Sequence, residues 1–79
     1  LTVRGVRFAM ILSELEPGRV KISFRSEEGT VPAAAVARSL GGGGHPRAAG
    51  ATLEGTVKDV VRKVRSALEE RHAEWAAAH

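Results

Sequence analysis

A ten-residue segment near the middle of the chain, GGGGHPRAAG at residues 41–50, combines residue types that bind anions. Its four glycines precede a histidine and, two residues further on, an arginine. Glycine has no Cβ, so a ligand can approach the backbone closely, and successive N–H groups can form a concave anion-binding surface. Imidazolium and guanidinium groups donate hydrogen bonds to phosphate oxygens. The residues predicted to bind a phosphate or nucleotide here are Gly42, Gly43, Gly44, His45 and Arg47.

A flexible linker is the main alternative for this glycine run, because glycine-rich linkers are mobile coils. Against that alternative, the run contains His45 and Arg47 and continues directly into AAGATL, a sequence typical of packed structure. The common phosphate-binding loops do not match. No Lys-Ser or Lys-Thr follows the glycines, as a nucleotide triphosphatase loop requires, and the spacing is not that of a dinucleotide fingerprint opening a long helix.

A second candidate site is the dipeptide Arg25-Ser26, at the end of a predicted strand. A side chain at a strand end can reach a ligand across the edge of the sheet, and the arginine fork matches two phosphate oxygens at once. The alternative is an exposed arginine on the polar face of the strand, where most strand arginines lie. The residue types alone leave both interpretations open.

The order of these features resembles the type-1 DHH-associated domain. A strand ending in Arg25-Ser26, an alanine-rich helix ending in Arg-Ser-Leu, the GGGGHPRAAG segment with its Gly-Gly-Gly-His motif, and a further strand and helix follow one another from about Val20 to about Leu68. In that family the domain is the C-terminal, substrate-binding half of two-domain phosphoesterases, including oligoribonuclease/pAp-phosphatases and RecJ-like exonucleases. The resemblance implies that Arg25 and Ser26 also help to hold substrate phosphate.

The resemblance further implies that residues 1–79 are one substrate-binding domain, a C-terminal fragment of a two-domain hydrolase. Its partners would be an N-terminal DHH catalytic domain of the same chain and a nucleotide or short-oligonucleotide substrate. Short RNA, single-stranded DNA, pAp and a cyclic dinucleotide remain open as substrates. The family's metal, manganese or magnesium, is expected in the catalytic domain, whose Asp-His-His motif does not occur here.

The chain itself is expected to be inactive and to hold no metal or cofactor. Metal-assisted phosphodiester hydrolysis needs several carboxylates and imidazoles that converge. Here the acidic residues are dispersed along the sequence, and His72 and His79 lie seven residues apart without a carboxylate in a ligand-like spacing. We therefore predict no catalytic residue in this chain.

Length and composition limit the function further. Seventy-nine residues form one domain, near the lower size limit for a single hydrophobic core. The absence of cysteine rules out disulfides and thiolate metal sites and fits a reducing compartment. No apolar run is long enough to cross a bilayer and no signal peptide opens the chain, so we expect a cytoplasmic protein without a membrane partner. A net charge of +3 suits a phosphate-rich partner.

Hydrophobic periodicity predicts the elements that position these residues. Period-2 alternation over residues 6–12 and 20–24, with Glu-Pro-Gly between the two segments, indicates an antiparallel hairpin. A helix over residues 33–40 is expected to begin at a Thr30 cap and to end at Gly41. A third strand over residues 49–54 and a second helix opened by Thr56 complete the chain. The predicted fold is α/β, a two-layer arrangement of a small mixed sheet with an N-terminal hairpin and two packed helices.

Two other classes of function remain as alternatives. A stand-alone module that binds single-stranded nucleic acid needs aromatic stacking platforms, and this chain has only two phenylalanines and one tryptophan. A purely structural interaction domain would leave the histidine and arginine of the glycine segment unexplained. The phosphoesterase substrate-binding domain is therefore the preferred prediction.

Overall fold

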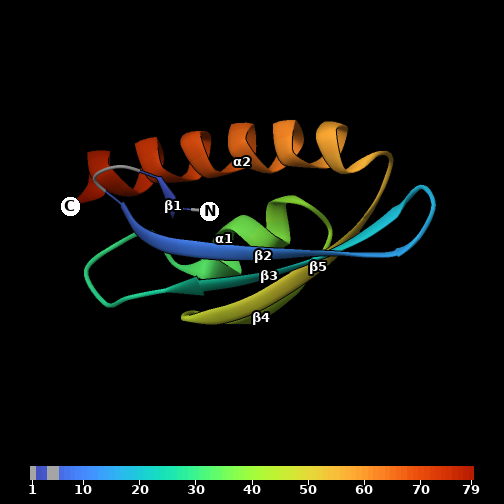
Figure 1. The fold of residues 1–79 in the computed structure, drawn as a ribbon. Coiled ribbons are helices and arrows are strands. Elements are labelled where there is room, and N and C mark those ends of the chain that lie inside the picture. Colours follow the sequence, from blue (N-terminus) through green and yellow to red (C-terminus); the bar gives the residue numbers. More distant parts are fainter. Residues whose placement is uncertain (1, 4–5) are drawn as a thin grey trace.

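The computed structural model describes residues 2–3 and 6–79 as one five-stranded sheet with two helices. Both helices pack on the same face of the sheet (Figure 1). The predicted α/β class, the N-terminal hairpin and the two packed helices are confirmed. In chain order the elements are β1 (Thr2–Val3), β2 (Val6–Glu16), β3 (Arg19–Ser26), α1 (Ala33–Ser39), β4 (Gly43–His45), β5 (Ala48–Glu54) and α2 (Val57–Ala78).

The hairpin of β2 and β3 is built from the alternation that the sequence shows. Met10 pairs with Phe24 and Leu12 with Ile22, so apolar side chains of both strands share one face. The strands are joined by Pro17 and Gly18 alone. Gly18 has a φ of 85°, which a type II turn requires at its third position and which glycine adopts without steric cost.

All strand pairings within the described residues are antiparallel, whereas a mixed sheet was predicted. The reason is β4, a strand inside the glycine run, where the sequence predicted no strand. This strand turns tightly through Pro46 and Arg47 into β5, and so reverses the chain before β5 enters the sheet. As a result β5 lies antiparallel to both of its neighbours in the strand order β1-β2-β3-β5-β4.

The two ends of α1 differ in how well the sequence predicted them. Thr30 was expected to be the N-cap, but Pro32 holds that position without a side-chain hydrogen bond, and the N–H of Ala33 in the first turn donates to the hydroxyl of Ser26. At the other end, Gly41 has a φ of 85°. The N–H groups of Gly41 and Gly42 donate to the carbonyls of Arg38 and Ala37 at 3.1 and 2.8 Å. This is the Schellman arrangement, so the predicted glycine cap is confirmed.

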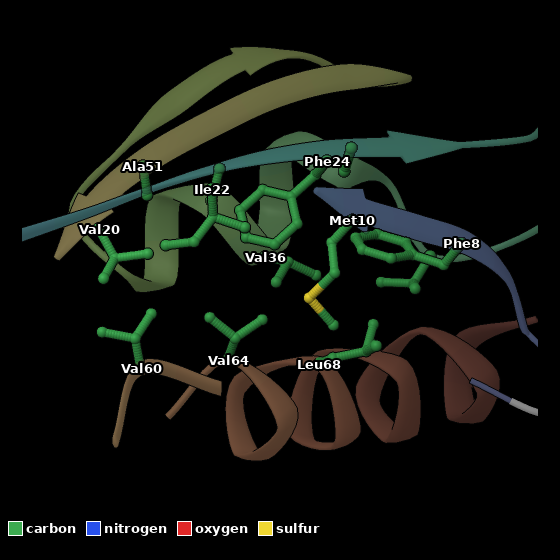
Figure 2. Packing of buried hydrophobic residues seen from close by; sticks show 13 residues of the cluster. Phe8, Met10, Val20, Ile22, Phe24, Val36, Ala51, Val60, Val64 and Leu68 are labelled. Atoms are coloured by element: carbon green, nitrogen blue, oxygen red, sulfur yellow. The ribbon is translucent and has the colours of Figure 1, made fainter. Parts of the chain in front are cut away.

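The hydrophobic core lies between the sheet and the helices (Figure 2). Thr56 caps α2 by accepting a hydrogen bond from the N–H of Asp59 at 3.1 Å, as predicted. Three fully buried residues at helical spacing, Val60, Val64 and Leu68, then face the buried side chains of the strands. The strand contribution comes from Phe8, Met10, Val20, Ile22, Phe24 and Ala51.

Candidate functional site

Along each strand, the residues that alternate with the buried ones point to the other face of the sheet, which neither helix covers (Figure 1). We call it the open face. The strand register arranges its residues in three rows that run across the strands. The arginine row is Ala9, Arg25, Ala48 and His45; the glycine row is Ile11, Ser23, Gly50 and Gly43; the lysine row is Ser13, Lys21 and Thr52.

The arginine row brings together two site residues that lie far apart in the sequence. Ala48 pairs with Arg25 on one side and with His45 on the other. Because paired Cα atoms in antiparallel strands are about 5 Å apart, the Cα atoms of Arg25 and His45 are separated by about 10 Å. Both residues are exposed, and the small side chain of Ala48 leaves the space between them free. A phosphate above Ala48 would lie within reach of both side chains.

A shallow depression of about 350 Å³ continues from Arg25 along the open face. Ser23 and the paired Gly43 and Gly50 lie in its middle, where the glycines contribute no side chain. A ligand can therefore approach the backbone of this part of the sheet closely. The lining residues are Lys21, Ser23, Phe24, Arg25, Gly43, Gly44, Ala48, Ala49 and Gly50.

The three glycines predicted to bind a ligand have different surroundings. A Cβ on Gly42 would overlap the carbonyl oxygen of Gly50 and approach the Cα of Ala51 to 2.8 Å. Gly44 has a φ of 144°, and a Cβ there would lie 2.6 Å from the Cα of Ala49. A Cβ on Gly43 would meet no atom within 4 Å. Gly42 and Gly44 therefore permit the close packing of β4, and Gly43 faces the depression.

The open face also keeps its positive charge. Three arginines of the strands and their turns form ion pairs with glutamates. Arg7 pairs with Glu27 at 3.2 Å, Arg19 with Glu16 at 3.3 Å and Arg47 with Glu28 at 3.0 Å in the described residues. No carboxylate of the described residues forms an ion pair with Arg25 or Lys21. These two cations are free to bind an incoming anion.

Four of the predicted site residues do not line the depression, namely Ser26, Gly42, His45 and Arg47. Ser26 is buried, and its hydroxyl donates to the carbonyl of Pro46 and accepts from the N–H of Ala33, both at 3.0 Å. Arg47 lies in the turn between β4 and β5, beside a smaller hollow of about 160 Å³ that is lined by the loop after β3. Ser26 thus ties the end of β3 to the turn after His45 and to the start of α1.

Lys21 is the residue of this face that the sequence-based prediction missed. A signal was present, because Lys21, Ser23 and Arg25 alternate with the buried Ile22 and Phe24 and must share a face. The predicted site included only the glycine segment and the Arg25-Ser26 dipeptide, and so left out the rest of the open face. The pairing of β3 with β5, which places Lys21 beside the glycine row, could not be read from alternation.

The residues 2–74 match the family model of the DHHA1 domain. The chain therefore belongs to the DHHA1 domain family. Domains of this family are associated with DHH-family phosphoesterases and typically follow a DHH catalytic domain. The resemblance to a DHH-associated domain is thereby confirmed at the level of the family.

No three histidine, aspartate or glutamate side chains within residues 2–3 and 6–79 come close enough together to hold a metal ion. Neither helix of this part of the chain combines the length and the apolar character needed to cross a membrane.

Proposed function

We propose that this DHHA1 domain binds the phosphate of a nucleotide or short oligonucleotide on its open face and presents it to a DHH catalytic domain for hydrolysis. The observation that carries this proposal is the arginine row, in which Arg25 and His45 flank a small residue without a neutralising carboxylate. The guanidinium offers two parallel donors to one phosphate, and the imidazole offers a third from the other side.

Each remaining site residue has a part in this proposal. Gly43 lets the ligand approach the backbone, while Gly42 and Gly44 keep β4 close to β5. Ser26 holds the turn after His45 in place. Arg47 would contact substrate only by exchanging Glu28 for phosphate, which is feasible because an exposed ion pair contributes only about 0–1 kcal/mol.

The chemical step would belong to the catalytic domain. There, manganese or magnesium would activate water and stabilise the charge that develops on phosphorus. The DHHA1 domain contributes by fixing the distance and orientation of the substrate phosphate, which converts a loose encounter into an effectively unimolecular reaction. We propose short oligonucleotides or nucleotide phosphates such as pAp as the substrates.

The aromatic residues argue against a stand-alone module for single-stranded nucleic acid. Phe8 and Phe24 are buried in the core with 2% and 0% exposure, and Trp75 packs against the same core from α2. The described part of the open face therefore has no phenylalanine or tryptophan ring on which a base could stack, and His45 is its single aromatic side chain.

The test uses the two-domain protein with Arg25→Ala and His45→Ala. Each variant loses a charge-assisted hydrogen bond, generally about 1.5–3 kcal/mol, so kcat/KM should fall about ten- to a hundredfold. Tm should stay at the wild-type value, because both side chains are exposed. Arg65→Ala on the exposed side of α2 is the matched control. Wild-type kcat/KM in both variants would refute the proposal.

A further inference from the structure

The three rows of the open face alternate in chemistry along the strands. The arginine row carries two potential cations, and the lysine row carries Lys21 between the hydroxyls of Ser13 and Thr52. The glycine row between them has no charged residue. Arg25 and Lys21 are four residues apart on one strand, which places their Cα atoms about 13 Å from each other. The two cationic side chains are therefore spread along the depression, which suits two successive phosphates of one strand.

The glycine row offers surroundings suited to a nucleoside. Gly43 and Gly50 leave the backbone bare, and Ser23 supplies a hydroxyl. Ile11, paired with Ser23, is 68% exposed on the neighbouring strand. A sugar and base could lie over this row, with an apolar wall on one side.

Lys21 is also a free cation. No carboxylate of the described chain pairs with it, although Arg19 on the same strand is paired with Glu16 at 3.3 Å. Its side chain lines the same depression as that of Arg25. The depression therefore presents positive charge at both ends and an uncharged middle.

On the basis of the proposed function, we infer that Lys21 binds a second phosphate, so that the site prefers an oligonucleotide strand to a nucleotide with one phosphate. The terminal phosphate lies at the arginine row, where two donor groups converge. The strand then crosses the glycine row, and a following phosphate reaches Lys21. Lys21 is in this way a specificity-determining residue that favours substrates with more than one phosphate.

The experiment compares two ligands on the 79-residue chain by NMR titration, 5′-AMP with one phosphate and the 5′-phosphorylated triadenylate pApApA with three. Lys21→Ala should weaken pApApA about fivefold or more, the effect of one partly solvated charge-assisted contact, and should leave 5′-AMP within about twofold. Lys58→Ala, which removes the same charge from the exposed first turn of α2, should change neither affinity. Lys21→Arg should retain most of the preference for pApApA.

The outcomes separate this inference from the function on which it rests. If Lys21→Ala leaves the ratio of the two dissociation constants unchanged while Arg25→Ala weakens both ligands, the second phosphate subsite is refuted and the proposed function stands. If Arg25→Ala weakens neither ligand, the proposed function fails and the inference fails with it. A folded spectrum for every variant is the condition for the comparison, and these exposed side chains meet it because none of them supports the core.

Discussion

At the scale of single residues, three neighbouring glycines serve different purposes. Gly42 and Gly44 are required by the protein itself, since a Cβ at either position would collide with the backbone of β5. Gly43 has open space above it and a φ outside the left-handed region, so the fold would accept a side chain there. A side chain at residue 43 would therefore affect only a ligand on the open face, such as the substrate of the proposed function.

Alanine at Gly43 and at Gly42 should consequently have opposite effects. Gly43→Ala should keep or raise stability, by up to about 1 kcal/mol from the lower entropy of the unfolded chain. Its methyl group would lift the ligand off the glycine row and lower kcat/KM of the two-domain protein about tenfold or more, because small misplacements are costly in catalysis. Gly42→Ala should lower the free energy of unfolding by about 1–3 kcal/mol through overpacking.

The measurements are a chemical denaturation curve and kcat/KM for each variant. Full activity in Gly43→Ala would show that the ligand does not approach this strand. A large loss of stability in the same variant would contradict the open space that the structure gives to residue 43.

At the scale of elements, the site depends on how the end of β3 is tied to its surroundings. The hydroxyl of Ser26 is buried between the Pro46 carbonyl and the Ala33 N–H, and it replaces the cap that Thr30 was expected to provide. This one side chain connects the strand that carries Arg25, the turn that follows His45 and the first turn of α1. The hydrogen bonds of Ser26 thus hold the strands that carry Arg25 and His45 in place before any ligand binds.

Ser26→Ala should therefore destabilise the domain. The Ala33 N–H and the Pro46 carbonyl would each lose the hydroxyl but keep the direct hydrogen bond between them at 2.6 Å, so the cost is about 0.5–1.5 kcal/mol. For a domain of this size each kcal/mol lowers Tm by about 4–8 °C. Ser66→Ala, at an exposed position on α2, is the control and should leave Tm almost unchanged. If instead Ser26→Ala preserved Tm and only abolished substrate binding, the hydroxyl would act on the ligand and not on the fold.

Much of the element structure could be predicted because it depends on local rules. Alternation gave the β2–β3 hairpin, and Thr56 and Gly41 gave two helix caps. The strand β4 could not be found in this way, since a glycine run has neither hydrophobic alternation nor β propensity. It exists because Gly42 and Gly44 let it approach β5 closely. Without β4, neither the antiparallel direction of β5 nor the position of Arg25 and His45 in one row could be predicted.

At the scale of the whole molecule, one face of the sheet forms the core and the other carries the candidate binding site. The helices cover one face and bury the core. The side chains of the other face are therefore not needed to form the core. Among the described residues, that face has Arg25 and Lys21 without an ion pair, two glycines side by side and the exposed Ile11. Such a surface can bind an anion without giving up stability, because none of its exposed groups contributes to the core.

The same division predicts that the 79-residue chain binds substrate but does not hydrolyse it. The open face supplies cations, and in the described residues no cluster of His, Asp or Glu could hold a metal ion near them. A phosphate held by Arg25 would be oriented but would meet no activated water, since that step needs a metal or a strong base.

Incubation of the purified chain with pApApA and manganese or magnesium should thus release no more nucleotide than a mock-purified control. Binding should be weak, with a Kd in the range of about 0.1–1 mM, because a few exposed contacts must offset the cost of association. The two-domain protein under the same conditions should turn the substrate over, and Arg25→Ala should slow it. Hydrolysis by the chain alone, lost in its Arg25→Ala variant, would mean that the open face performs chemistry itself, and the division between a binding face and a separate catalytic domain would then be wrong.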